Sequence, residues 1–334
     1  MNIFRKSLFS ILVFLSLFVL AGGQNAKAAA RHPIEIVKTD RAFNVSEKGR
    51  NVLSYRHKPV SLDGKFTHPD YVHPLYNLDG NILTEDFPKD HRHHRGIFWA
   101  WHQIYVGDKR LGDSWSLVNF SYDVREVKIL DVDSKSKAIR AKVHWKSSLW
   151  TDGGGKEKPF VEETTTIRVF SAEPGMRKVD FEISLLALEK DVRIGGSNNA
   201  RGYGGFSIRI KLPEGMEFTD PNGPVVPQGT AVEPASWMDL SGRFGDDAKI
   251  SGLSVLCHQS TPGYPQPWIL RSKRSMQNPV YPGRDPVELS TEKPLVLRYR
   301  LIIHDGDVNQ INLSKLCAEY NAEYSDSSQK CSAK

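Results

Sequence analysis

The sequence predicts an all-β protein, built as a large antiparallel β-sandwich with few helices. Short runs that alternate apolar and polar residues recur along the chain, and clusters of Gly, Pro, Asn and Asp separate them. Only residues 313–324 show a clear helical pattern. Of the 334 residues, 39% are hydrophobic and 25% are charged, a globular composition that argues against disordered and coiled-coil proteins.

The strand predictions rest on six runs. In residues 178–187, alternation places Val179, Phe181 and Leu185 on one face. Residues 163–170 are rich in β-branched side chains, which favour strands. The other runs are residues 124–132, 138–145, 206–212 and 295–303. Because each run has an apolar and a polar face, we expect strands buried on one side, as in antiparallel sheets.

The N-terminus has the pattern of a secretory signal peptide. Arg5 and Lys6 precede an apolar run at residues 8–21, and small residues that suit a cleavage site follow. The run is shorter than the about 20 residues that a membrane-spanning helix needs. We therefore expect a signal peptide over residues 1–30, a periplasmic or secreted location, and no stable membrane insertion after cleavage.

The rest of the chain is predicted to form one large domain. We expect a single β-sandwich over residues 31–312, with a long surface excursion at 213–234, and a C-terminal helix and tail over 313–334. The alternative is two sandwiches that meet near residue 150. Removing residues 1–30 takes away three of the 45 basic residues and none of the 39 acidic ones, and no basic run reaches five residues. This argues against nucleic-acid binding.

The three cysteines allow more than one arrangement. Cys257 lies in an apolar run and is predicted to be a buried free thiol. Cys317 and Cys331 lie close together in the sequence and are a candidate disulfide in an oxidising compartment, although a pairing with Cys257 stays open. No CxxC pattern is present, so a thiolate zinc site is not expected.

The richest segment in chemistry runs from residue 67 to residue 102. It carries six of the eleven histidines, which are His68, His73, His91, His93, His94 and His102. Its alternation is poor and its Pro and Gly content is high, so we expect a loop followed by a strand at residues 96–102. Loops held by a sheet are common places for functional sites.

These histidines have three chemical interpretations. In the first, a histidine exchanges protons with a carboxylate partner, since imidazole titrates near neutral pH. In the second, they bind a metal, but an extended chain points His91 and His93 to one side and His94 to the other. In the third, they are structural. We favour catalysis and predict no metal ligands; the candidate catalytic residues are His91, His93, His94, Glu85, Asp86 and Glu163.

A second set of residues is predicted to bind a substrate. Exposed indole rings suit the apolar faces of sugars, although each also suits a core. Arginines suit substrate oxygens. The predicted binding residues are His73, Arg95, Trp99, His102, Arg201, Tyr203, Trp237 and Trp268. The glycine-rich stretch at residues 195–205 precedes a predicted strand rather than a helix, which argues against a nucleotide loop, and the sequence identifies no cofactor.

The stretch from His73 to Tyr76 and then from Thr84 to Gly96 resembles the signature of a bacterial family labelled "methane oxygenase PmoA-like" and now treated as a domain of unknown function. Weaker similarity follows at residues 205–209, 237–242, 266–268 and 297–306. The chain departs from the family pattern at Arg92, where proline is expected. It has no series of spanning segments, so it does not suit a membrane methane oxygenase.

The resemblance implies a secreted β-protein of polysaccharide-degrading bacteria. It also implies a fold similar to the galactose-mutarotase-like supersandwiches, whose sites place His, Glu and Arg on a concave sheet face. We therefore expect a carbohydrate-active enzyme that acts on a glycoside or sugar derivative as a hydrolase, lyase or epimerase. The alternatives are a non-catalytic carbohydrate-binding protein and a metal-dependent enzyme that uses the histidines.

Overall fold

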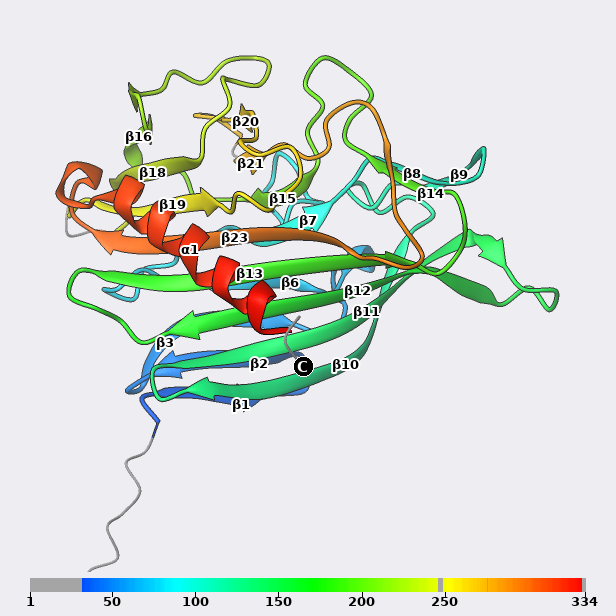
Figure 1. Cartoon of the computed structure of the whole chain (residues 1–334), viewed down its shortest axis with the longest axis horizontal. Helices are drawn as coiled ribbons and strands as arrows, with labels where there is room; N and C mark the ends of the chain where they lie inside the picture. Colours follow the sequence, from blue (N-terminus) through cyan, green and yellow to red (C-terminus); the bar gives the residue numbers. More distant parts are fainter. Residues whose placement is uncertain (1–31, 246–248, 275, 332–334) are drawn as a thin grey trace, which may run out of the picture. The chain divides into compact units, whose positions relative to one another are not determined.

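The structure, a computed structural model, describes residues 32–245, 249–274 and 276–331 (Figure 1). The predicted signal peptide lies outside the described residues. The all-β prediction is confirmed, because two large antiparallel sheets and a single α-helix dominate the described chain. None of the described helices is long and apolar enough to cross a membrane.

The smaller of the two large sheets has six strands. In spatial order they are β1 (Ile34–Lys38), β2 (Ala42–Glu47), β3 (Arg50–Arg56), β6 (Tyr71–Leu75), β7 (Ile97–Ala100) and β15 (Gly205–Ile208). The predicted strand at residues 96–102 corresponds to β7. Gly96 precedes this strand, and a Cβ there would overlap the carbonyl oxygen of Val72. Only glycine therefore lets β7 approach β6 this closely.

The larger sheet has nine strands. In spatial order they are β10 (Ser121–Asp133), β11 (Ser136–Thr151), β12 (Glu157–Phe170), β13 (Met176–Ala187), β23 (Leu295–Asp305), β19 (Ser251–Cys257), β18 (Trp237–Arg243), β16 (Glu214–Asp220) and β17 (Gly223–Pro224). Five of the six predicted runs fall in these strands. The expected excursion at 213–234 begins with β16 and β17, which pair with the edge of the sheet instead of leaving it.

Short strands complete the fold. One small sheet contains β22 (Val287–Glu288), β14 (Val192–Gly195), β8 (Gln103–Val106) and β9 (Lys109–Gly112). Two hairpin-like pairs are β4 (Val60–Leu62) with β5 (Lys65–His68), and β20 (Trp268–Ile269) with β21 (Asn278–Pro279). A 3-10 turn, Val308–Gln310, precedes α1 (Leu313–Cys331).

The main core lies between the two large sheets. The apolar face predicted for residues 178–187 is fully buried there. Phe181 of β13 contacts Phe206 of β15 and Trp99 of β7, with ring centroids 5.2 and 6.4 Å apart, and Phe206 stacks on Tyr299 of β23. These contacts join strands from both sheets, so the sandwich is closed by interleaved aromatic rings.

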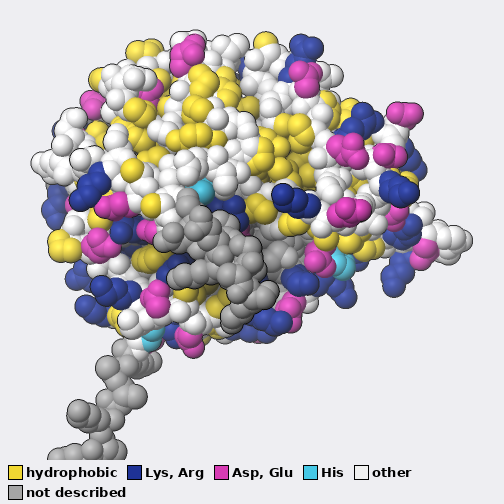
Figure 2. All heavy atoms as spheres, in the orientation of Figure 1, with side chains coloured by type: hydrophobic (Ala, Val, Ile, Leu, Met, Phe, Trp, Pro, Cys, Tyr) yellow, Lys and Arg dark blue, Asp and Glu magenta, His cyan; other side chains and the backbone are white. Residues whose placement is uncertain are grey.

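Each large sheet also has an outer face that is partly covered. The helix α1 lies across the nine-stranded sheet, over β13 and β23 (Figure 1), where Arg300 binds Asp180 and Glu323. On the six-stranded sheet, Tyr71 and Phe98 pack outward in a second cluster of buried apolar residues. This second face carries the candidate site described below. On the face drawn in Figure 2, basic and acidic side chains are interspersed rather than separated by sign.

The cysteine predictions have different outcomes. Cys257 and Cys317 are both buried free thiols, which confirms the prediction for Cys257. The candidate disulfide between Cys317 and Cys331 involves the side chain of Cys331, which lies outside the described side chains.

Candidate functional site

The histidine-rich segment is a loop that joins two neighbouring strands, β6 and β7. Its path is fixed by bonds back to the sheet. Thr84 Oγ1 accepts a hydrogen bond from the Leu75 amide and lies 3.0 Å from His73 Nδ1, and the Glu85 amide donates to the Arg209 carbonyl. Because His73 is bonded within the base of the loop, the structure places it in the support of the site.

Arg95 is the internal anchor of this loop. Its guanidinium is fully buried, lies 2.9 Å from Asp86, and donates to the carbonyl oxygens of Val60 and Phe66. It also stacks on Phe87, with 3.4 Å between the guanidinium carbon and the ring centroid. Arg95 and Asp86 were predicted as a binding and a catalytic residue. In the structure Arg95 holds loop backbone, and Asp86 pairs with Arg95 and accepts a hydrogen bond from the Tyr71 hydroxyl.

A second arginine, Arg209, supports the outer half of the loop. It directly follows β15 and is 4% exposed. It forms ion pairs of 2.9 Å with Glu85 and 2.8 Å with Asp90, and its Nη1 lies 3.5 Å from His94 Nδ1. Burial raises the pKa of Asp90, but hydrogen bonds from His91 and Arg209 outweigh it and lower this pKa to about 2. Glu85 and Asp90 are therefore occupied by a fixed cation.

Three histidine rings pack against one another on this support. His91 stacks on His94 at 4.8 Å between centroids, and His93 meets His94 edge-on at 4.7 Å. Burial, followed by the charges of His93, His91 and Arg209, lowers the pKa of His94 to about 2. Burial and the charges of His91 and His102 lower the pKa of His93 to about 4. His93 and His94 are therefore neutral at physiological pH.

Next to these rings lies an Asp–His pair. His102 Nδ1 is 2.9 Å from Asp113 Oδ2, while Asp113 Oδ1 accepts the Ser116 amide. Burial opposes ionisation of Asp113, yet the hydrogen bond and charge of His102 and the backbone bonds lower its pKa overall. The other ring nitrogen of His102, Nε2, is buried and has no hydrogen-bond partner among the described residues.

Aromatic rings connect the Asp–His pair to the other histidines. His102 stacks on Trp115 at 5.2 Å and meets Tyr203 edge-on at 4.9 Å, and Trp115 contacts His94 at 5.7 Å. We call the set His91, His93, His94, His102, Asp113, Trp115 and Tyr203 the histidine site. Its members lie on the side of β7 where Phe98 packs, opposite the core-facing Trp99.

Positive charge borders the histidine site. Burial raises the pKa of Tyr203, and the charges of Arg201 and Arg271 oppose this rise. Burial and the charge of Arg201 lower the pKa of Arg271. Arg201 is exposed, whereas Arg271 is half-buried and donates to the carbonyls of Gln228 and Gly229. Two cations near Tyr203 favour a ligand that carries or develops negative charge.

Several predicted residues lie elsewhere. Glu163 is fully buried in the sandwich core, where it accepts hydrogen bonds from Trp99, Trp145 and Thr165. Burial raises its pKa. Trp99 and Trp268 are at most 1% exposed and Trp237 is 7% exposed, so the structure offers none of these indole faces to a ligand. Of the predicted binding residues, His102 and Tyr203 belong to the histidine site, and Arg201 borders it.

The residues that the sequence interpretation missed are Asp113, Trp115 and Arg209. A hairpin signal could have found the first two. Gly107 and Asp108 mark a turn, and the pairing of β8 with β9 brings Ile104 opposite Gly112. Extending that register by one or two positions places His102 near Asp113. Arg209 depends on the non-local pairing of β15 with β7, for which the sequence carries no local signal.

The described residues contain no group of three or more His, Cys, Asp or Glu side chains arranged to hold a metal ion. No curated protein matches the sequence. One family model does match, over residues 42–318, and its description is a family of unknown function, DUF6807. The match runs from β2 into α1 and includes every member of the histidine site. The chain belongs to the family of unknown function DUF6807.

Proposed function

We propose that this protein is a carbohydrate-active enzyme whose proton-transfer group is His102. The proposal rests on one observation, the buried and partnerless Nε2 of a histidine whose Nδ1 is held by Asp113. Nδ1–H donates to Asp113, so the neutral ring carries its lone pair on Nε2. A substrate C–H or O–H is the natural partner of that lone pair.

In the proposed reaction, Nε2 takes a proton from the substrate and the ring becomes an imidazolium. Asp113 stabilises this cation through the Nδ1–H hydrogen bond. The electron pair left on the substrate is stabilised by the positive charge of Arg201 and Arg271. His93 and His94 stay neutral, so they hydrogen-bond hydroxyl groups. Tyr203, which is half-buried, offers a ring to a sugar face.

This geometry favours proton abstraction, as in a lyase or an epimerase, over hydrolysis. Glycoside hydrolysis commonly needs two carboxyl groups on either side of the bond. At the histidine site, Glu85 and Asp90 are ion-paired with Arg209, and Asp113 is bonded to His102. None is free to attack a sugar or to donate a proton. The galactose-mutarotase-like supersandwich and a secreted or periplasmic location remain part of this proposal.

A non-catalytic carbohydrate-binding protein is the second candidate. The lowered pKa values of His93 and His94 favour it, because histidines that stay neutral serve as hydrogen-bonding groups rather than proton carriers. In that case His102 would also bind a hydroxyl group without exchanging its proton.

The test is turnover of a panel of neutral, uronic and sulfated oligosaccharides, followed by mass spectrometry and ultraviolet absorbance. A lyase yields fragments that sum to the substrate mass and absorb in the ultraviolet. For an epimerase, NMR detects the product at unchanged mass. We expect His102→Gln to reduce kcat at least about 100-fold. His144→Gln, a change at a partly exposed histidine of β11, is the matched control. Full activity of His102→Gln would contradict the assignment.

A further inference from the structure

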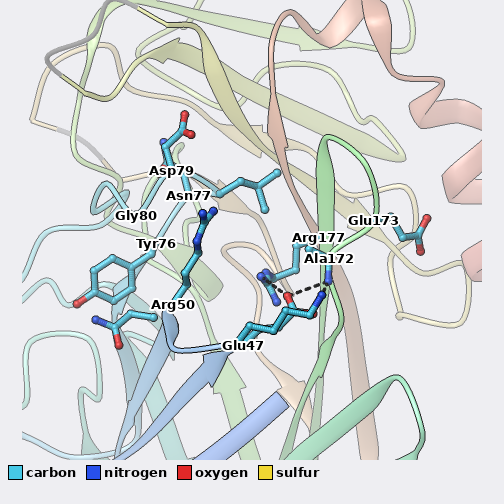
Figure 3. Close-up of a pocket in the computed structure, with 12 residues that line it drawn as sticks. Glu47, Arg50, Tyr76, Asn77, Asp79, Gly80, Ala172, Glu173 and Arg177 are labelled. Atoms are coloured by element: carbon cyan, nitrogen blue, oxygen red, sulfur yellow. Dashed lines mark hydrogen bonds and ion pairs between the residues drawn. The ribbon is translucent and has the colours of Figure 1, made fainter. Parts of the chain in front are cut away.

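A separate cavity of about 840 Å³ lies at one end of the sandwich. It is lined by the turn between β2 and β3, by residues 76–80 after β6, and by residues 172–177 at the start of β13 and just before it. Figure 3 shows Arg50, Tyr76 and Asn77 along one wall and Glu47, Ala172 and Arg177 along the other. The volume is within the range of about 300–1,000 Å³ typical of small-molecule sites. No residue of the histidine site lines it.

The carboxylates of this cavity are all paired. Glu47 binds Arg177 at 2.8 Å and accepts the Ala172 amide, and both side chains of this ion pair are almost fully buried. Asp79 lies 3.6 Å from Lys249. Glu173 lies 2.9 Å from Lys178. Each negative charge in the lining is therefore offset by a cation.

Two cations of the cavity have no such partner. Lys48 and Arg50 line it, and neither has an acidic partner among the described residues. The described lining carries three cations, Lys48, Arg50 and Arg177, and three carboxylates, two of which pair with lysines outside the lining. Because the carboxylates are paired with other cations, Lys48 and Arg50 are left to bind an anionic ligand.

The turn between β2 and β3 determines where these two cations lie. Lys48 and Gly49 form the two-residue turn between β2 and β3, and both have positive φ, 48° and 80°. This turn type favours Asn, Asp or Gly at its first position, because a Cβ is strained at positive φ and Asn and Asp tolerate it best. Lys48 is one of nine described non-glycine residues with positive φ. The following residue, Arg50, begins β3 and extends along the cavity wall (Figure 3).

The remaining lining suits a sugar. Tyr76 contributes a half-buried ring and a phenol, and Asn51 contributes an exposed carboxamide. Neither side chain has a hydrogen-bond partner among the described residues. Aromatic rings contact the C–H faces of sugars, and carboxamides bond hydroxyl groups. Arg50 presents a planar fork of donors that matches a carboxylate, sulfate or phosphate group.

We propose that this cavity is a second ligand site, which binds an acidic sugar through Arg50 and Lys48. The anion part of the proposal stands on the charges of the cavity alone. The sugar part rests also on the proposed function. The site provides binding only, and it takes no part in proton transfer at His102.

The experiment is titration calorimetry of the full chain at low salt with D-glucuronate, D-glucose 6-sulfate, D-glucose and inorganic sulfate. We expect the two acidic sugars to bind at least about 10-fold more tightly than glucose, and added salt to weaken them. Arg50→Ala should weaken acidic sugars about 10-fold or more, and Lys48→Ala by less. Lys65→Ala, at an exposed lysine of β5, should change nothing.

Three outcomes would overturn the proposal. Equal affinity for glucuronate and glucose would remove the anion part, and so would unchanged binding by Arg50→Ala. Inorganic sulfate that binds as tightly as glucuronate would remove the sugar part. Loss of glucuronate binding in His102→Gln would move the ligand to the histidine site. Turnover tests the proposed function and not the cavity. Arg50→Ala should therefore leave kcat on a neutral substrate unchanged.

Discussion

Two regions of this molecule place a carboxylate beside aromatic rings, and they differ in which polar atoms they leave without a partner. In the core, Glu163 accepts hydrogen bonds from two indoles and a hydroxyl and has no exposed surface. On the outer face of β7, Asp113 holds His102, and the far nitrogen of that ring has no partner. A carboxylate surrounded by fixed donors stabilises a fold. A carboxylate that orients another titratable group prepares that group for a ligand.

The largest expected effect concerns the Asp113–His102 pair. Asp113→Asn keeps the size of the side chain but lets an amide N–H face His102 Nδ1, which favours the wrong imidazole tautomer. We expect kcat to fall about 1,000-fold, with the free energy of unfolding changed by less than about 1 kcal/mol. Turnover assays and urea denaturation measure the two quantities. A variant that loses stability in proportion to activity would make Asp113 a structural residue.

A change at Glu163 in the core should lower stability and leave kcat nearly unchanged. Glu163→Gln replaces one acceptor oxygen by an N–H donor, which then faces an indole N–H or the Thr165 hydroxyl. Leaving a buried donor unsatisfied costs about 1–3 kcal/mol, and we expect unfolding to become easier by about 2–3 kcal/mol. Below the unfolding temperature, kcat should change less than about threefold if Glu163 has no part in chemistry. A large drop in kcat without loss of stability would return Glu163 to the catalytic candidates.

These two regions also show how far sequence interpretation reaches. The strands were predictable because alternation records which side chains face the core. The same alternation predicts which face Glu163 occupies, because Glu163 shares a face of β12 with Val161, Thr165 and Ile167. A residue on that face is expected to be buried. Glu163 was nevertheless predicted to be catalytic, because a carboxylate at the start of a strand is a plausible acid or base.

The histidine site was predictable only in part. The high frequency of histidines located the loop. It could not show that His94 belongs to the site, whereas His73 and Arg95 hold the loop in place. In β7 both faces are buried, Trp99 inward and Phe98 outward, so periodicity alone cannot tell which aromatic residue faces the site. The partners of the loop come from β15 and from the hairpin after β8. These contacts depend on pairing between distant segments, which the local sequence does not specify.

The histidine site and the core should also differ in how their contributions to stability depend on pH. The pKa of His94 is about 2 and that of His93 about 4 in the folded state, both below the ordinary value of about 6.5. Stability from these neutral rings is fully present above pH 6.5 and is lost as the pH falls toward their folded pKa values. We expect His94→Gln to lose less stability between pH 7 and pH 4 than the parent, by about 2 kcal/mol. Thermal unfolding across that range measures it, and parallel curves would contradict the assignment.

The smallest expected effect has the opposite sign. Burial and then the charge of Glu163 raise the pKa of Asp70 well above its ordinary value, so this carboxyl keeps its proton, while its Oδ1 accepts the Tyr55 hydroxyl at 2.6 Å. Stability from protonated Asp70 is fully present below the unfolded pKa of about 3.9 and is lost as the pH rises through the folded pKa. Asp70→Asn imitates the protonated form at every pH. We therefore expect it to match the parent at pH 4 and to exceed it by at least about 1 kcal/mol at pH 8. If the variant is instead less stable at both values, Asp70 is ionised in the folded protein, and the core then resembles the histidine site in holding a charge that neighbouring groups must balance.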